Sequence, residues 1–279
     1  MPRLHIRSML KYNRLSLVEG HGLQHHFPLH THHALIIGLL TAGIRLMIYR
    51  EESVTIQPGE IFIVNPGEAH ACRPMGKQAL DYRILCIQPD LLPNGFIGKY
   101  RFEHHLKNPQ VVQSLITCFQ ELDTCLPEKR EAILSGFIRQ FYEQWGTLSD
   151  GKKALPVVEQ TRLYLEVHSG EKVNIRQLGQ AVSLSPYHLN RLFHRCTGIT
   201  PHAYQLQIKI QRAQELLNQG SSPIEAAIEL GFSDQSHFSR FFKKYVGLSP
   251  AAYRRQNREV DISADEIVRI VREGRERGY

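Results

Sequence analysis

Histidines crowd one stretch near the start of this 279-residue chain, and imidazole can bind metal ions, carry protons or hydrogen-bond a ligand. Alternate side chains of a strand share one face, so His30 and His32 would point the same way, and His70 would face them from a later strand. Three such rings suit either a divalent ion or hydrogen bonds from neutral imidazoles to a small molecule. The crowded stretch holds six histidines within thirteen positions: His21, His25, His26, His30, His32 and His33.

A second group of side chains recurs near the C-terminal end at a constant spacing. A fixed internal period indicates one supersecondary unit that was built twice. The repeated Arg can hydrogen-bond the edge of a DNA base. Six positions return 49 residues later: His188, Arg191, Phe193, Gly198, Pro201 and Tyr204 as His237, Arg240, Phe242, Gly247, Pro250 and Tyr253.

Short amphipathic helices must position these repeated side chains. Ser185 and Pro186 have the residue types of an N-cap and a first helical residue, and Gly198 suits the helix end. Leu189 and Phe193 begin one apolar face, so each unit predicts a helix-turn-helix whose second helix fits a major groove. Two surface helices of an ordinary bundle are the alternative, which the duplicated polar positions disfavour. The outward side chains are Tyr187, Asn190 and Arg191 in the first copy and Gln235, Ser236 and Arg240 in the second.

Excess positive charge is confined to the repeated region. Residues 152–258 carry 15 Lys and Arg against 7 Asp and Glu, whereas residues 1–151 carry 15 against 14. Residues 259–279 carry 4 against 6, so the +7 of the whole chain comes from the repeated units. DNA phosphates attract such an excess, although a basic surface can also serve only solubility.

Residues 157–256 resemble the DNA-binding domain of the AraC/XylS family of bacterial transcription regulators, which contains two helix-turn-helix units. The resemblance is carried by residues 231–244 (GFSDQSHFSRFFKK), then by residues 247–250 (GLSP) and by Tyr253 and Arg254. It implies that the six outward side chains contact bases. Lys209 stands where the family usually has Arg, which keeps the charge and loses the bidentate fork. Phosphate contacts are expected from Lys209, Lys243, Lys244 and Arg254.

The first half of the chain predicts short strands followed by two helices. Apolar or β-branched runs at residues 34–40, 45–49, 53–56, 60–64 and 82–87 alternate with turn residues, which favours an antiparallel sandwich or small barrel. Helical periodicity then runs from Val111 to Leu122 and from Ala132 to Trp145. These two helices would either form a dimer interface or cap the barrel. The predicted class is α+β, an antiparallel β-barrel with two following helices and then an all-α domain.

Residues 15–95 resemble the cupin-like effector domain of the same family. The matching segments are residues 30–32 (HTH), 58–60 (PGE) and 65–70 (NPGEAH), and both Pro-Gly pairs suit type II turns. The resemblance implies a small effector bound in the barrel. An apolar cavity with a few polar groups is the usual form of such a site. We expect His30, His32 and His70 near its mouth, and Ile37, Leu39, Met47, Ile61 and Ile63 inside it.

Metal-binding cupins offer an alternative chemistry for these histidines. There, an H-x-H pair and a later His hold a divalent ion, usually with a Glu. This chain has residues 34–37 (ALII) where that Glu would follow His32. We therefore favour neutral imidazoles that hydrogen-bond an effector, and we expect no cofactor. Metal binding by His30, His32 and His70 stays open as the alternative. His104 and His105 are expected on the surface.

Cysteine usage and hydropathy bear on the compartment. The five cysteines are scattered and form no C-x-x-C pair, which is typical of thiols in a reducing cytosol. The N-terminal residues lack a signal-like pattern, and no apolar run approaches the ~18 residues of a membrane span. A cytoplasmic protein with no membrane partner is expected.

Together these features predict a sequence-specific, effector-responsive transcription regulator that is not an enzyme. Residues 1–150 would bind the effector and dimerise, residues 151–258 would bind double-stranded DNA, and residues 259–279 would form a helical tail opened by a capping box at 263–266. The expected partners are DNA, a small effector, a second copy of the chain and RNA polymerase, which an activator would contact. The alternatives are a metal-dependent cupin enzyme with a DNA-binding domain and a constitutive architectural DNA-binding protein.

Overall fold

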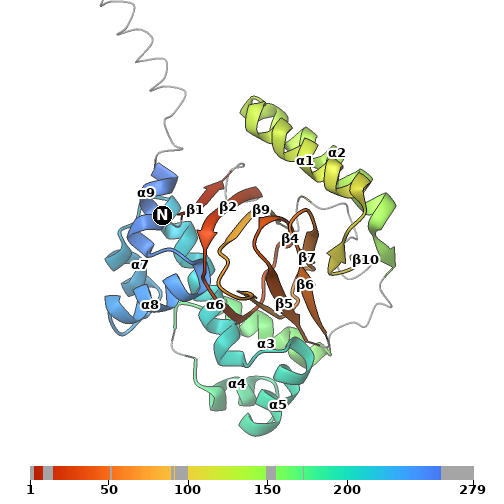
Figure 1. Cartoon of the computed structure of the whole chain (residues 1–279). Coiled ribbons are helices and arrows are strands. Elements are labelled where there is room, and N and C mark those ends of the chain that lie inside the picture. The colour runs from red at the N-terminus through yellow and green to blue at the C-terminus, as the bar shows by residue number, and fades with distance from the viewer. Residues whose placement is uncertain are drawn as a thin grey trace, which may run out of the picture.

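The chain folds into an antiparallel β domain followed by a helical domain, as the computed structural model shows (Figure 1). The structure describes residues 3–8, 15–50, 52–88, 91, 100–148, 155–171 and 173–258. This arrangement confirms the predicted α+β class. The predicted boundary at residue 150 and the predicted tail at 259–279, with its capping box, lie outside the described residues.

Two antiparallel sheets form the β domain. The larger sheet has the strand order β1-β2-β9-β4-β7-β11 and the smaller one has the order β3-β8-β5-β6; β10 and β12 form a separate pair. The larger sheet consists of β1 (Arg3–Ser8), β2 (Leu15–Leu23), β9 (Leu80–Ile87), β4 (Leu35–Ala42), β7 (Ile61–Val64) and β11 (His105–Leu106). The others are β3 (Phe27–His30), β8 (His70–Pro74), β5 (Arg45–Tyr49), β6 (Ser53–Ile56), β10 (Tyr100–Arg101) and β12 (Thr147–Leu148).

Two Pro-Gly turns fix the ends of β7. Gly59 and Gly67 have φ angles of +85° and +74°, which favour glycine. Each turn closes with a backbone hydrogen bond of 3.1 Å, one between Glu60 and Gln57 and the other between Glu68 and Asn65. The predicted type II turns therefore set where β7 begins and where the connection to His70 starts.

The larger sheet is buried on both faces. The face with Ile37, Leu39, Ile61 and Ile63 packs against α1 (Pro109–Thr124) and α2 (Arg130–Trp145), which cover it as a cap. Because β4 and β7 are apolar at nearly every position, alternation could not tell the two faces apart. The prediction that these four residues line the effector cavity is wrong. Their neighbours Ile36, Phe62 and Val64 face it instead.

Seven helices make up the described part of the C-terminal domain. Ser185 and Asp234 cap α5 and α8 through hydrogen bonds of 3.3 Å and 2.7 Å to backbone N–H groups three residues on. Gly198 and Gly247 end the same helices with φ angles of +81° and +87°. The helices are α3 (Pro156–Val167), α4 (Ile175–Ala181), α5 (Pro186–Thr197), α6 (Pro201–Asn218), α7 (Pro223–Glu229), α8 (Gln235–Val246) and α9 (Pro250–Arg258).

The helical domain closes one end of the barrel. In Figure 1, α6 runs beside the barrel. Helices α4 and α5 lie toward one end of α6, and α7 and α8 lie toward its other end. Barrel and helical side chains share one hydrophobic cluster, which includes Met47 and Phe62 from the strands and Ile210 and Tyr253 from α6 and α9. Gln256 of α9 also donates to the Leu4 carbonyl of β1 at 2.7 Å. The barrel interior is therefore completed by the helices that follow it.

Candidate functional site

A cavity of about 640 Å³ lies where the barrel meets the helical domain. Its barrel side is lined by apolar side chains such as Met47 and Ile84, and its helical side includes Gln207 of α6 and Tyr245 of α8. Small-molecule sites commonly have this size and this mixture of apolar wall and few polar groups.

The three predicted histidines converge at the edge of this cavity. His30 Nδ1 lies 2.6 Å from the Pro28 carbonyl, so Nδ1 carries the proton and Nε2 is an acceptor. His32 Nε2, 3.0 Å from His30 Nε2, therefore donates to it. His70 Nδ1 lies 3.3 Å from the Glu68 carbonyl and donates there, which leaves Nε2 as the acceptor nitrogen of the ring.

Burial keeps the three rings neutral near pH 7. It lowers the pKa of His30 to about 4, and the positive charge of Arg45 adds to the effect. Burial also lowers the pKa of His32 and of His70 well below the usual range, with further repulsion from the neighbouring rings. Neutral imidazoles offer hydrogen bonds rather than charge.

The same three rings have ligand nitrogens within 4.8 Å of one another. Nitrogens on one tetrahedral ion, each about 2.0–2.1 Å from it, would lie about 3.3–3.4 Å apart, near the 3.0 Å between His30 and His32. The charged groups around the site bear on whether it would hold a cation. Among the described residues no carboxylate joins the cluster, and Arg45 already disfavours positive charge on His30 and His70.

Arg45 is a polar residue of the cavity wall that was not among the residues predicted from the sequence. Alternate residues of β5 are buried, so Arg45 points into the barrel with Met47 and Tyr49. Arg45 is only 4% exposed. Its Nη2 donates to Cys72 Sγ at 2.8 Å. A charged group thus lies in a largely apolar cavity.

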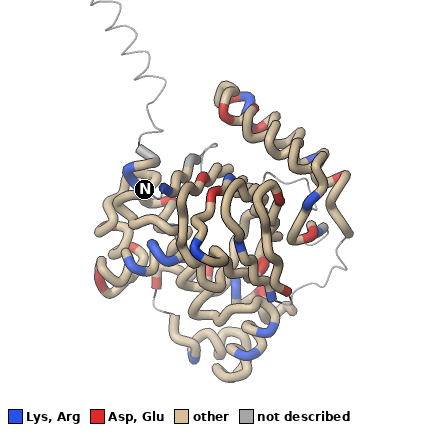
Figure 2. The backbone as a smooth tube through the Cα atoms, in the orientation of Figure 1, with Lys and Arg blue, Asp and Glu red and all other residues tan. Residues whose placement is uncertain are grey.

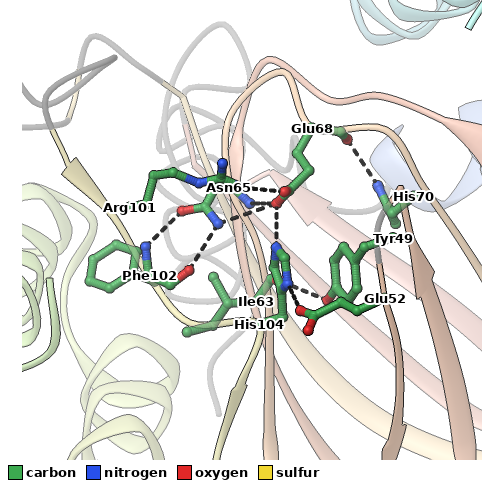
Figure 3. A network of polar contacts seen from close by, with 9 residues as sticks. All are labelled: Tyr49, Glu52, Ile63, Asn65, Glu68, His70, Arg101, Phe102 and His104. Carbon is green, nitrogen blue, oxygen red and sulfur yellow. Dashed lines mark hydrogen bonds and ion pairs between the residues drawn. The ribbon is translucent and has the colours of Figure 1, made fainter. Parts of the chain in front are cut away.

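A polar network supports the connection that carries His70 (Figure 3). His104 lies between two carboxylates: its Nε2 is 2.8 Å from Glu68, and its Nδ1 contacts Glu52. Burial alone would lower the pKa of His104, but the hydrogen bonds to these carboxylates outweigh it and the pKa is raised. The predicted surface position is wrong for His104 and His105, whose side chains are 15% and 14% exposed and pair with glutamates.

The two helices predicted to enter DNA grooves present polar side chains to solvent. Tyr187 is 75% exposed, and the other five predicted base-contacting residues are exposed too. Lys243 and Lys244 lie exposed in the last turn of α8. In Figure 2, Lys and Arg recur on the helical domain around α5 and α8. The outward residues are Tyr187, Asn190 and Arg191 on α5 and Gln235, Ser236 and Arg240 on α8.

Lys209 and Arg254, which were both predicted to contact phosphate, form hydrogen bonds within the helical domain. Lys209 is 8% exposed, and its Nζ donates to the Leu230 carbonyl at 2.6 Å. Burial lowers its pKa, and the prediction that it contacts phosphate is wrong for this arrangement. Arg254 is half-buried and donates to the Gly220 carbonyl at 2.7 Å. The sequence could not indicate these two contacts, because they depend on how α6 and α9 pack against the turns on either side of α7.

Known proteins match both halves of the chain. Residues 14–136 match the AraC-like ligand binding domain, and residues 178–256 match a helix-turn-helix domain. The uncharacterized HTH-type transcriptional regulator YbfI of Bacillus subtilis is 32% identical over 228 residues, which cover 77% of this chain and 82% of YbfI. The chain belongs to the AraC family of transcription regulators.

Further relatives of this AraC-type regulator agree with that assignment. The transcriptional activator RhaS of Pectobacterium carotovorum is 27% identical over 257 residues, covering 86% of this chain and 91% of RhaS. The crystal structure of an apo variant of ToxT from Vibrio cholerae has the same fold, with a TM-score of 0.59 at 13% identity, covering 87% of this chain and 96% of ToxT. The protein therefore combines a ligand-binding barrel domain with a DNA-binding helical domain. No helix among the described residues is long and apolar enough to cross a membrane.

Three residues that line the cavity of this AraC-type regulator were not among those predicted from the sequence. Arg45 shares its strand face with Met47, so the two-residue period of β5 could have indicated it. Gln207 and Tyr245 face the barrel from α6 and α8. Nothing local marks them, because only the docking of the two domains turns them toward the cavity.

Proposed function

We propose that the effector of this regulator binds in the cavity between the barrel and α6 and changes how the barrel holds the two recognition helices. The observation that carries the proposal is the shared lining: Met47 and His30 come from the barrel, and Gln207 and Tyr245 come from the helical domain. A ligand there touches both domains at once. Its affinity then depends on their relative position, and by linkage their relative position depends on the ligand.

Direct contacts connect the barrel to α6 and to α8. Gln207 Oε1 accepts hydrogen bonds from Thr31 N and Oγ1, at 3.0 Å and 2.9 Å, beside the histidine cluster. His25 Nε2 lies 3.1 Å from the carbonyl of Lys244 in α8. These contacts supply the path by which an occupied cavity would move α6 and α8.

On DNA, we assign base contacts to the exposed residues of α5 and α8. Phosphate contacts are assigned to Lys243 and Lys244, whose charges lie at the end of α8. One chain would place its two recognition helices in successive major grooves, ~34 Å apart, on an asymmetric site. A homodimer formed through the N-terminal domain would bind two such sites as direct repeats. RNA polymerase would be the partner at a regulated promoter. We place the protein with the chromosome, in the bacterial cytoplasm.

We assign the histidines to effector binding rather than to catalysis. His30, His32 and His70 would offer hydrogen bonds from neutral rings to the ligand. One ToxT structure of this fold is described as bound to an unsaturated fatty acid, which is a property of ToxT. Elemental analysis of the purified protein distinguishes the two chemistries: near-stoichiometric zinc, iron or nickel that a chelator removes would contradict this assignment and support the metal alternative.

A cavity-filling variant tests the proposed function. Met47 lies 1% exposed against the cavity, and Met75 lies 42% exposed outside it. The operator is first obtained by selection from random DNA, and effectors by a thermal-shift screen of metabolites. Met47→Trp should remove the effector's influence on operator affinity while the affinity of the ligand-free protein stays the same. Met75→Trp is the matched control and should respond like the parent. A full response in Met47→Trp would contradict the site.

A further inference from the structure

The strongest unexplained feature of the cavity is the guanidinium of Arg45. Its Nε and Nη1 are shielded from solvent and have no hydrogen-bond partner. Only Nη2 is bonded, to the thiol of Cys72. Among the described residues no carboxylate forms an ion pair with it. A buried charge of this kind is strongly unfavourable until an opposite charge meets it.

The surroundings of Arg45 accommodate the cation without neutralising it. Its Cζ lies 4.6 Å from the centre of the Phe62 ring and 4.7 Å from that of Tyr82. Aromatic faces attract a guanidinium, but they carry no net charge. His30 and His70 nearby are neutral because burial lowers the pKa of each. The cavity wall at this place therefore carries one uncompensated positive charge.

We propose that Arg45 receives the carboxylate of the effector, which makes the ligand a small monocarboxylic acid with an apolar body. This inference rests on the proposed function, since it assumes that the cavity holds the effector. Guanidinium binds carboxylate through two parallel hydrogen bonds. One Nη2 hydrogen is used by Cys72. The other Nη2 hydrogen forms, with Nε or with Nη1, a pair of adjacent donors that have no hydrogen-bond partner.

The single charge of Arg45 and the apolar wall of the cavity restrict the chemistry of the ligand further. A single guanidinium balances a monoanion, whereas a phosphate monoester would bring nearly two negative charges. A neutral sugar or amide would leave the charge unbalanced. The remaining wall near Arg45, with Met47, Phe62 and Ile84, is apolar and suits an alkyl or aryl body.

Matched acid and amide probes test this inference on the full chain without DNA. The probes are butanoate, octanoate and 4-phenylbutanoate with their primary amides, measured by calorimetry and thermal shift. The parent should bind at least one acid about 10- to 100-fold more tightly than its amide, the range for a hydrogen bond to a charged group. Arg45→Met should bring that ratio close to one while the amide still binds. Arg45→Lys, which keeps the charge and loses the fork, should fall between.

A control and a second readout keep the test decisive. Arg73 is exposed on the neighbouring strand β8, opposite Leu46, so Arg73→Met should leave the ratio unchanged. Without ligand, Arg45→Met should unfold at a higher temperature than the parent, because it removes an unpaired buried charge. Lower thermal stability of ligand-free Arg45→Met, an unchanged acid-to-amide ratio in that variant, or a parent that prefers none of the acids would each overturn the inference.

The same measurements distinguish a failure of the Arg45 inference from a failure of the proposed function. If acid and amide bind equally and both change operator affinity, the cavity is the effector site and Arg45 is not its anchor. If the acid binds through Arg45 and operator affinity does not change, the anchor is right and the coupling to DNA is wrong.

Discussion

Replacing Gln207 by Leu should weaken the contact between the barrel and α6. Gln207 is 6% exposed, and its Oε1 accepts both the backbone N–H and the hydroxyl of Thr31. Each of these two hydrogen bonds contributes roughly 0.5–1.5 kcal/mol net, and the Thr31 N–H that would be left buried without a partner adds a cost. The free energy of unfolding should therefore fall by about 2–3 kcal/mol. That loss corresponds to a melting temperature lower by roughly 4–12 °C in a chain of this size.

The assay combines urea denaturation with hydrogen exchange of the full chain. Exchange at Thr31 and the adjoining loop should become faster in Gln207→Leu, and the effector's influence on operator affinity should shrink. Gln205→Leu is the matched control. Gln205 lies two residues away on α6, is equally buried at 6% exposed, and donates to the Glu171 carbonyl at 3.0 Å inside the helical domain. It should lower stability as well and leave the exchange at Thr31 slow.

A double-mutant cycle with Thr31→Val measures the hydroxyl part of this contact. A coupling energy of about 1 kcal/mol is expected for one hydrogen bond between touching residues. A coupling within about 0.3 kcal/mol of zero, the range found for independent sites, would refute the assigned hydrogen bond. Equal loss of exchange protection at Thr31 in both Gln variants would show that α6, rather than Gln207, holds the barrel.

Three further predictions concern DNA and pH. Arg191→Ala or Arg240→Ala should cost ~1–3 kcal/mol at the selected operator if that Arg pairs with guanine, with a much smaller loss on random DNA; equal losses on both would remove the base contact. Replacing Lys243 and Lys244 together by Ala should weaken binding to all sequences and reduce the salt slope by about one unit per lost contact, so an unchanged slope in a salt titration would take both out of the interface. Because burial lowers the pKa of His30 from 6.5 to about 4, the unfolded chain takes up the proton first as the pH falls, and stability should drop between these values by about 1.4 kcal/mol per pH unit for this ring. Denaturation of a His30→Gln variant across that pH window should show a shallower pH dependence of stability. The raised pKa of His104 works in the opposite direction, because the stability that His104 contributes is present in acid and is lost as the pH rises.

The helical domain could be predicted closely because its signals are local. Ser185 and Gly198 have the residue types that begin and end a helix, and the structure caps and ends α5 at these residues. The 49-residue repeat predicted a second such unit, and α8 has the same left-handed glycine after it, at Gly247. A repeat and a cap involve residues that are near one another in the chain, so they can be recognised without the fold.

The barrel interior could be predicted only in part. Met47 faces the cavity as expected, but Ile37 and Ile61 lie on the opposite face of their sheet, against α1 and α2. A strand buried on both faces shows no polar alternation, so its orientation depends on which layer each face meets. Arg45 was overlooked for a related reason, because an isolated basic residue at the start of a strand is usually on the surface.

By itself the sequence determined the two-unit helical domain, the strand-rich first half and the convergence of His30 and His32 with His70. Each of these follows from short-range periodicity, from turn residues or from a repeat. Three features depend on the tertiary structure: α6, α8 and α9 close the barrel, Lys209 is buried against the Leu230 carbonyl, and Arg45 has no carboxylate partner among the described residues. These are contacts between residues distant in sequence, and their positions are set by how two hydrophobic surfaces pack rather than by any local pattern.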